Sequence, residues 1–154
     1  MAFSINENLA KEISGGALLS VKSGDKVNAM TVSWGGFGVL FGREVCFIFV
    51  RPSRFTYGMC EDEEKFTLTF FGEEYGNVLK YCGTKSFRDT DKIKDLSLSY
   101  KTDDGYVVFD GAKTTLKLKK IYCDFIKKDN FTDTFPLKNY KNGDFHKMYI
   151  CQIV

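Results

Sequence analysis

The hydrophobic positions of the chain recur mostly at every second residue, which is typical of β-strands. Segment 45–50, VCFIFV, is a continuous apolar run of strand length and suits a strand buried on both faces. Segment 66–71, FTLTFF, alternates large apolar residues with threonine. Weaker strand segments, most of them bounded by Gly, Asp or Asn, lie at 17–21, 29–34, 106–109, 114–122 and 147–153. The pattern predicts about seven short strands.

Helical signals are few and short. Segments 56–63 and 73–81 have helical character, and 89–96 suggests a further turn with Asp89 as its N-cap. Many short strands with few helices predict a mainly β barrel or sandwich rather than an alternating α/β sheet. No linker, repeat or low-complexity tract divides the sequence, so we expect residues 1–154 to form a single domain.

Composition narrows the class of protein. The chain has 22 basic and 20 acidic side chains, interleaved along the sequence, so nucleic acid is not an expected partner. No apolar run approaches the ~20 residues of a membrane span, and the first residues lack the order of a signal peptide. We therefore expect a soluble cytoplasmic protein with no membrane partner.

Cysteine and histidine usage limits the chemistry. The five cysteines are widely spaced and form no CxxC pair, so we expect reduced, mostly buried thiols rather than disulfides or a zinc site. His146 is the only histidine, which excludes a metal site built from several histidines. A bound cofactor is therefore the expected source of the chemistry.

The first segment of functional interest is 28–36, NAMTVSWGG. On a strand, its side chains would divide between two faces, with Met30, Val32 and Trp34 on one and Thr31 and Ser33 on the other. Gly35 and Gly36 would let the backbone approach a ligand closely. The alternative is a core strand that ends in a glycine turn.

The second segment, 51–57 (RPSRFTY), follows the most apolar strand. It combines two guanidinium groups and two hydroxyls, those of Arg51, Arg54, Ser53 and Thr56. These donors at the start of a helix suit a phosphate monoester. The alternative is that both arginines are solvated and pair with the acidic residues of 61–64.

The third segment, 81–94 (YCGTKSFRDTDKIK), is a polar loop that leads into a short helix. Taken alone it suits a solvated, charged turn. Its order in the chain adds information, because the motifs NxMTVSWG, VRPSRxTY, FTLTFF, CGxxSxRDxDK and HxMYIxxIV follow one another over nearly the whole length. In this order the chain resembles the flavin reductase-like family that includes flavoredoxin.

The resemblance implies an FMN-binding split β-barrel of Greek-key topology that forms a homodimer with flavin near the subunit interface. It implies FMN contacts from three groups of residues: Asn28, Met30, Thr31, Val32, Ser33 and Trp34 near the ring; Arg51, Ser53, Arg54 and Thr56 near the ribityl phosphate; and Cys82, Gly83, Ser86, Arg88 and Lys92 in a covering loop. Relatives commonly have glycine where this chain has Phe87, which does not adopt positive φ cheaply and puts the loop path in question.

The resemblance also places His146 close to the flavin, where an imidazole could hydrogen-bond the ring or a nicotinamide. The alternative is a half-buried histidine on the last strand. Two functions follow: an enzyme that passes electrons from NADH or NADPH through FMN to a flavin or other acceptor, or a non-enzymatic FMN carrier between redox protein partners. A third possibility is a β-barrel interaction module that binds no flavin.

Overall fold

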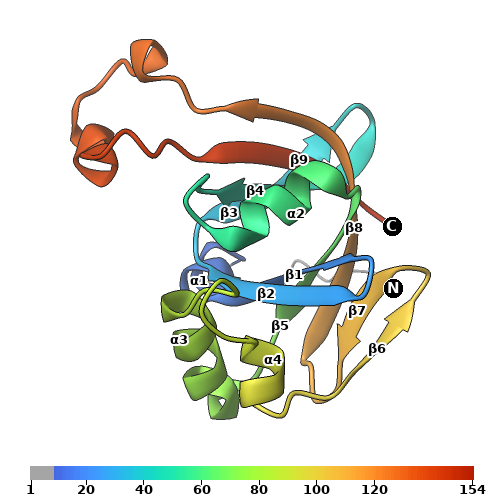
Figure 1. The fold of residues 1–154 in the computed structure, drawn as a ribbon. Helices are drawn as coiled ribbons and strands as arrows, with labels where there is room; N and C mark the ends of the chain where they lie inside the picture. The colour runs from blue at the N-terminus through green and yellow to red at the C-terminus, as the bar shows by residue number, and fades with distance from the viewer. Residues whose placement is uncertain (1–8) are drawn as a thin grey trace.

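The computed structural model describes residues 9–154, which form mostly β structure with a few short helices (Figure 1). The strands in this part of the chain are β1 (Ala17–Ser23), β2 (Lys26–Val32), β3 (Gly35–Leu40), β4 (Arg43–Val50), β5 (Lys65–Phe70), β6 (Tyr100–Asp103), β7 (Tyr106–Phe109), β8 (Thr114–Phe125) and β9 (Lys147–Ile153). The helices are α1 (Leu9–Ser14), α2 (Phe55–Asp62), α3 (Gly76–Thr84) and α4 (Lys92–Asp95), with short 3₁₀ segments η1 (Glu73–Tyr75), η2 (Lys128–Asn130) and η3 (Phe135–Tyr140).

Seven strands form one antiparallel sheet in the order β2-β1-β5-β8-β9-β4-β3, and β6 pairs with β7 in a separate hairpin. The two edge strands of the large sheet, β2 and β3, are separated in sequence only by residues 33 and 34. Six flat strand spacings would hold them roughly 29 Å apart, whereas a two-residue connection spans only about 10 Å. The sheet must therefore curl into a split barrel, with residues 33 and 34 at the opening.

Two apolar clusters flank the first strands. Inside the curled sheet, the buried side chains include Val21, Phe66 and Leu118. On the other side of β1 and β2, Leu18 and Ala29 pack with α3, α4 and the β6–β7 hairpin. Both faces of β1 are buried as a result, and this fixes the position of α3 and α4 beside β2.

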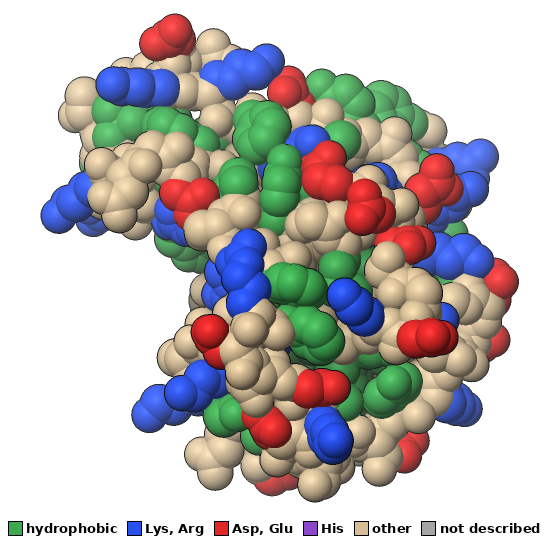
Figure 2. Space-filling view, in the orientation of Figure 1, with side chains coloured by type: hydrophobic (Ala, Val, Ile, Leu, Met, Phe, Trp, Pro, Cys, Tyr) green, Lys and Arg blue, Asp and Glu red, His purple; other side chains and the backbone are tan. Residues whose placement is uncertain are grey.

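A long excursion between β8 and β9, residues 126–146, projects from the barrel and carries η2 and η3 (Figure 1). We call it the arm. The rings of Phe131, Tyr140 and Phe145 pack together within it, with Tyr140 and Phe145 stacked at 4.6 Å between centroids. Figure 2 shows a hollow between this projection and the rest of the molecule, with basic side chains along its edge.

The prediction of a mainly β split barrel is confirmed, and each of the seven predicted strands is present. Strands 106–109 and 147–153 have the predicted bounds, and the other five differ at one end or both. The predicted strand 29–34 was wrong at both ends, because β2 begins at Lys26 and stops at Val32, before the chain crosses the opening. Strand β4 is not fully buried on both faces, since Phe47 and Phe49 are half-buried. Strands β3 and β6 and helix α1 were not predicted.

The predicted helices differ in detail. Segment 73–81 is divided into η1 and α3, which begins at Gly76 and continues to Thr84. The helical turn near 89–96 shortens to α4, and its N-cap is Asp91 rather than Asp89, because the Asp91 side chain accepts a hydrogen bond from the Lys94 amide. All five cysteines are free thiols, and only Cys123 is not fully buried. Within residues 9–154, no helix is both long and apolar enough to cross a membrane.

Candidate functional site

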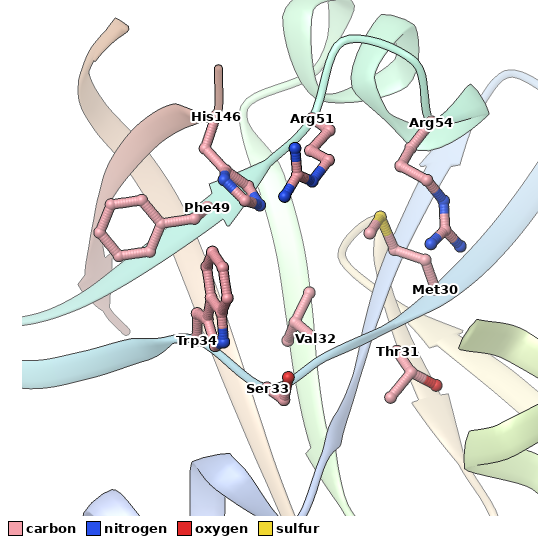
Figure 3. A pocket seen from close by; sticks show the side chains of 9 residues that line it. All are labelled: Met30, Thr31, Val32, Ser33, Trp34, Phe49, Arg51, Arg54 and His146. Atoms are coloured by element: carbon pink, nitrogen blue, oxygen red, sulfur yellow. The ribbon is translucent and has the colours of Figure 1, made fainter. Parts of the chain in front are cut away.

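A cavity of about 230 Å³ opens where β2 crosses to β3, beneath the loop that follows β4 (Figure 3). Segments far apart in sequence meet there, from the end of β2, the end of β4, the residue before α2 and the residue before β9. The side chains that line it are Met30, Thr31, Val32, Ser33, Trp34, Phe49, Arg51, Arg54 and His146. It combines aromatic walls with cationic and hydroxyl groups, as small-molecule sites commonly do.

The end of β2 that borders the cavity packs closely against α3, and the chain that follows it packs closely against β4. The Thr31 hydroxyl donates to the Leu79 carbonyl of α3, and a Cβ at Gly83 would lie 3.4 Å from the Thr31 Cβ, so glycine lets α3 approach β2 closely. A Cβ at Gly35 would lie 2.6 Å from the Phe47 carbonyl oxygen. Gly35 therefore serves the approach of β3 to β4, while Ser33 and Trp34 stay exposed at the opening.

Arg51 and Ser53, just after β4, hold the arm. The two terminal nitrogens of Arg51 donate to the carbonyls of Asp144 and Asn139 at 3.0 and 2.9 Å, and its guanidinium lies over the Tyr140 ring. The amide and hydroxyl of Ser53 both donate to the Asp144 carboxylate. The donors predicted to bind phosphate are thus engaged by the protein's own carboxylate and carbonyls, and the alternative pairing with residues 61–64 is wrong.

Arg54 and Lys92 meet at the C-terminus of α3. Arg54 donates to the carbonyls of Cys82 and Gly83 at 3.1 and 3.3 Å, and the Lys92 ammonium lies 3.4 Å from the Cys82 carbonyl. Lys92 is only 1% exposed, and its burial lowers its pKa from 10.5 to about 8. Burial also lowers the pKa of Arg54. Neither cation forms an ion pair with any carboxylate in residues 9–154.

The predicted covering loop lies against the start of α2. Phe87 stacks on Phe55 at 5.0 Å between centroids, and Arg88 donates to the Ser53 carbonyl at 2.7 Å. The Ser86 hydroxyl accepts from the Arg88 amide and so shapes the turn. Phe87 is not among the residues with positive φ, so the loop follows an ordinary backbone path and uses the ring as an anchor. Arg88 is a third cation here without an ion pair among the described residues.

Asn28 and Thr56 were predicted to contact the cofactor, but neither lines the cavity. The Asn28 side-chain amide donates to the Thr56 hydroxyl at 2.9 Å, and both side chains are buried at 1% exposure. This bond joins β2 to the first turn of α2 and so sets where Arg54 lies. Their contribution in this structure is to hold the two elements that frame the site.

His146 lies on the arm side of the cavity and is 8% exposed. Its ring contacts Trp34 at 5.0 Å and Phe49 at 6.4 Å between centroids, and its Nδ1 lies 2.8 Å from the Tyr140 hydroxyl. Burial, with the nearby positive charge of Arg51, lowers the pKa of His146 from 6.5 to about 4. The imidazole is therefore neutral at physiological pH.

Eight of the nine cavity residues had been named from the sequence, all except Phe49. Phe49 belongs to a uniformly apolar strand in which nothing singles it out. Tyr140 and Asp144 were also missed. Asp144 lies 91 positions from its partner Ser53, and Tyr140 lies six positions from its partner His146 within the irregular arm, so no local sequence pattern shows either contact. His146 lines the cavity, and its contact with a flavin stays a prediction.

Solved structures with the same fold were found, although no family model and no curated protein matches the sequence. An FMN-binding protein from Thermus thermophilus superposes with a TM-score of 0.70 at 18% identity, over 90% of this chain and 67% of that chain. Flavoredoxin from Methanosarcina acetivorans gives 0.69 at 15% identity, over 90% and 65%. The styrene monooxygenase flavin reductase of Pseudomonas putida S12 gives 0.66 at 14%, over 91% and 76%. The chain therefore has the split β-barrel fold of the flavin reductase-like, FMN-binding proteins.

Proposed function

We propose that this chain binds FMN in the cavity at the barrel opening and works as a flavin reductase, taking electrons from NADH or NADPH. The observation that carries the proposal is the meeting, in one cavity, of residues from three separate motifs: the β2 end, the loop after β4 and His146. Similar folds include proteins described as FMN-binding and as flavin reductases.

The residues present fit a flavin at both of its ends. Trp34 and Phe49 supply apolar faces for a planar ring, and the neutral His146 and exposed Ser33 supply polar groups beside them. On the other side, Arg54 lines the cavity, and Arg88 and the buried Lys92 lie behind it, outside the lining. No carboxylate within residues 9–154 forms an ion pair with any of these three cations. A phosphate monoester supplies the missing negative charge.

FMN, when bound, supplies a ring that accepts hydride from a nicotinamide and passes electrons on. The chain's own contribution is placement and electrostatics. Trp34, Phe49 and His146 form one aromatic wall of the cavity through their mutual ring contacts. Arg54, which lines the cavity, would hold the phosphate of a bound FMN, and Lys92, bound to the same Cys82 carbonyl, would add a second positive charge beside it.

The test is to load the purified protein with FMN and mix it anaerobically with NADH or NADPH while following flavin absorbance. We expect about one FMN per chain and bleaching by at least one nucleotide. If the protein binds FMN stably and the flavin is bleached by dithionite but by neither nucleotide, the reductase proposal is rejected in favour of a non-enzymatic electron carrier. Absence of FMN binding would reject both the reductase and the electron carrier. The remaining function would be a β-barrel interaction module that binds no flavin.

We also propose that the chain is a homodimer with residues of both subunits near each flavin. Large apolar side chains are exposed at the barrel opening, at the β3–β4 turn and on the arm, where Trp34, Phe41 and Phe135 are 46, 65 and 67% exposed. A stable dimer would bury at least ~2,000 Å² in total. Light scattering at micromolar concentration is expected to give twice the chain mass, and a monomeric mass for the FMN-loaded protein would contradict this.

A further inference from the structure

We propose that Tyr140 is a positioning residue whose hydroxyl holds His146 in the neutral tautomer that presents an Nε2–H donor to the cavity. The use of that donor toward a flavin rests on the proposed function. The tautomer itself is a property of the protein without any ligand, so the two can be tested separately.

The geometry assigns one nitrogen of the ring to the arm. The Tyr140 hydroxyl lies 2.8 Å from His146 Nδ1, and the two rings meet nearly at right angles, 82° apart and 5.5 Å between centroids. Trp34 and Phe49 pack against other sides of the imidazole and restrict its rotation. Nε2 has no hydrogen-bond partner among residues 9–154, so it is the nitrogen that remains for the cavity.

The direction of the hydrogen bond between Tyr140 and His146 follows from the need of both side chains to use their polar atoms. A neutral imidazole has one protonated and one bare nitrogen. If Nδ1 carried the proton and donated to Tyr140, the phenol proton would have no acceptor inside the described part of the chain, although Tyr140 is only 8% exposed. If the phenol donates to a bare Nδ1, both groups are satisfied and the Nε2 proton faces the cavity.

The surroundings of His146 keep the imidazole neutral, and only the neutral ring has one bare nitrogen. The charged and titratable groups that face His146 are Arg51, Asp144 and Tyr140. Burial disfavours the charged imidazole most strongly. The Arg51 guanidinium, over the Tyr140 ring at 5.0 Å, acts in the same direction, against the weaker opposing effect of Asp144. With its pKa lowered to about 4, His146 acts as a fixed hydrogen-bond donor and does not exchange a proton at neutral pH.

The backbone around the pair is held at both ends. Arg51 binds the carbonyl of Asn139, the residue before Tyr140, and that of Asp144, two residues before His146. Ser53 binds the Asp144 carboxylate as well. The turn that carries Tyr140 and His146 is therefore attached to the end of β4, which keeps the hydroxyl in register with Nδ1.

The chain's single histidine makes the first test direct. In ¹⁵N-histidine-labelled, ligand-free protein only one imidazole contributes, and we expect a bare, pyridine-type Nδ1 and a protonated Nε2 from about pH 5.5 to 9. Tyr140→Phe should shift the signals toward a mixture of tautomers and raise the pKa of His146. Tyr149→Phe removes a buried hydroxyl bonded to Glu61 and should leave the imidazole signals unchanged. A protonated Nδ1 in the wild type overturns the proposal, even if the variants fail to fold.

The second test measures function in the FMN-loaded protein. Tyr140→Phe and His146→Gln should each slow flavin reduction by NADH or NADPH roughly three- to tenfold, the equivalent of one neutral hydrogen bond, with little change in nucleotide affinity. The double variant should be no slower than His146→Gln alone, because Tyr140 acts through His146. If flavin reduction is slower in the double variant than in His146→Gln, Tyr140 does not act through His146 and the proposal is refuted. Failure of the wild type to bind FMN would reject the proposed function and leave the tautomer measurement standing.

Discussion

Replacing Lys92 with methionine is expected to stabilise the flavin-free protein and, at the same time, to weaken its binding of FMN. Lys92 is buried to 1% exposure, its only hydrogen bond in the described part of the chain is a long one of 3.4 Å to the Cys82 carbonyl, and Arg54 adds a second positive charge beside it. A methionine keeps most of the unbranched stem and removes the charge. The folded protein then no longer bears the cost of burying an ammonium group.

The magnitude follows from the pKa of Lys92. Its decrease from 10.5 to about 8 means that both folded and unfolded chains are protonated below pH 8, where the full cost is present. At ~1.4 kcal/mol per pKa unit this cost is at most about 3.5 kcal/mol, and we expect Lys92→Met to gain ~1–3 kcal/mol at pH 7. Between pH 8 and 10.5 only the unfolded chain keeps the proton, so the free energy of unfolding of the wild type should rise with pH and the advantage of the variant should disappear.

The assay is urea unfolding of the flavin-free proteins at pH 7 and pH 10, followed by FMN titration at pH 7. Loss of one charged hydrogen bond of ~1.5–3 kcal/mol predicts FMN binding weaker by roughly 10- to 100-fold. Lys94→Met, an exposed position on the same helix α4, is the matched control and should change neither quantity. A Lys92→Met protein less stable than wild type at pH 7 would refute the uncompensated charge, and unchanged FMN affinity would refute the phosphate contact.

Three further predictions concern other parts of the site. Arg54→Gln should weaken FMN binding ~10- to 100-fold and leave riboflavin binding unchanged in calorimetry, and equal wild-type affinity for the two flavins would contradict a phosphate site. Gly35→Ala should lower the free energy of unfolding in urea by ~2–4 kcal/mol, because its Cβ would lie 2.6 Å from the Phe47 carbonyl oxygen, and a loss under ~0.5 kcal/mol would contradict this. Phe87→Ala should lose the stacking on Phe55 and speed limited proteolysis within 85–91, and unchanged cleavage would show that the ring does not anchor the loop.

Much of the barrel could be predicted because its strands are apolar at a regular period. Strands β4 and β5 carry runs whose composition alone indicates burial, and their register follows once the barrel closes. Strand β3, with the sequence GGFGVL, gives no such signal, because three of its six residues are glycine. It forms through pairing with β4 across a turn at Phe41 and Gly42, which both have positive φ. Positive φ at both positions is typical of tight hairpins, but the sequence Phe-Gly is not one of the pairs that predict such a turn.

The parts of the candidate site that consist of consecutive residues could be predicted from the sequence. Contacts between residues of different segments could not. The stretch 30–34 reads as a ligand-facing segment, and it lines the cavity. The bond between Tyr140 and His146 joins residues only six apart, yet their meeting depends on the irregular path of the arm. The Ser53 contact with Asp144 crosses 91 positions, and neither residue carries a local signal for the other. Such pairings are decided by tertiary packing rather than by local preference.

Two groups of hydrogen-bond donors lie beside the cavity, and only one of them contacts a carboxylate. Ser53 donates twice to the Asp144 carboxylate. A phosphate there would have to displace that carboxylate and break both bonds between Ser53 and the arm that carries His146. Arg54 and Lys92 hold only the carbonyl oxygens at the end of α3, which carry partial charges. A phosphate on that side would neutralise full charges without displacing a carboxylate. The energetic balance therefore favours a phosphate beside α3 and α4, which leaves the arm free to keep His146 at the opposite wall of the cavity.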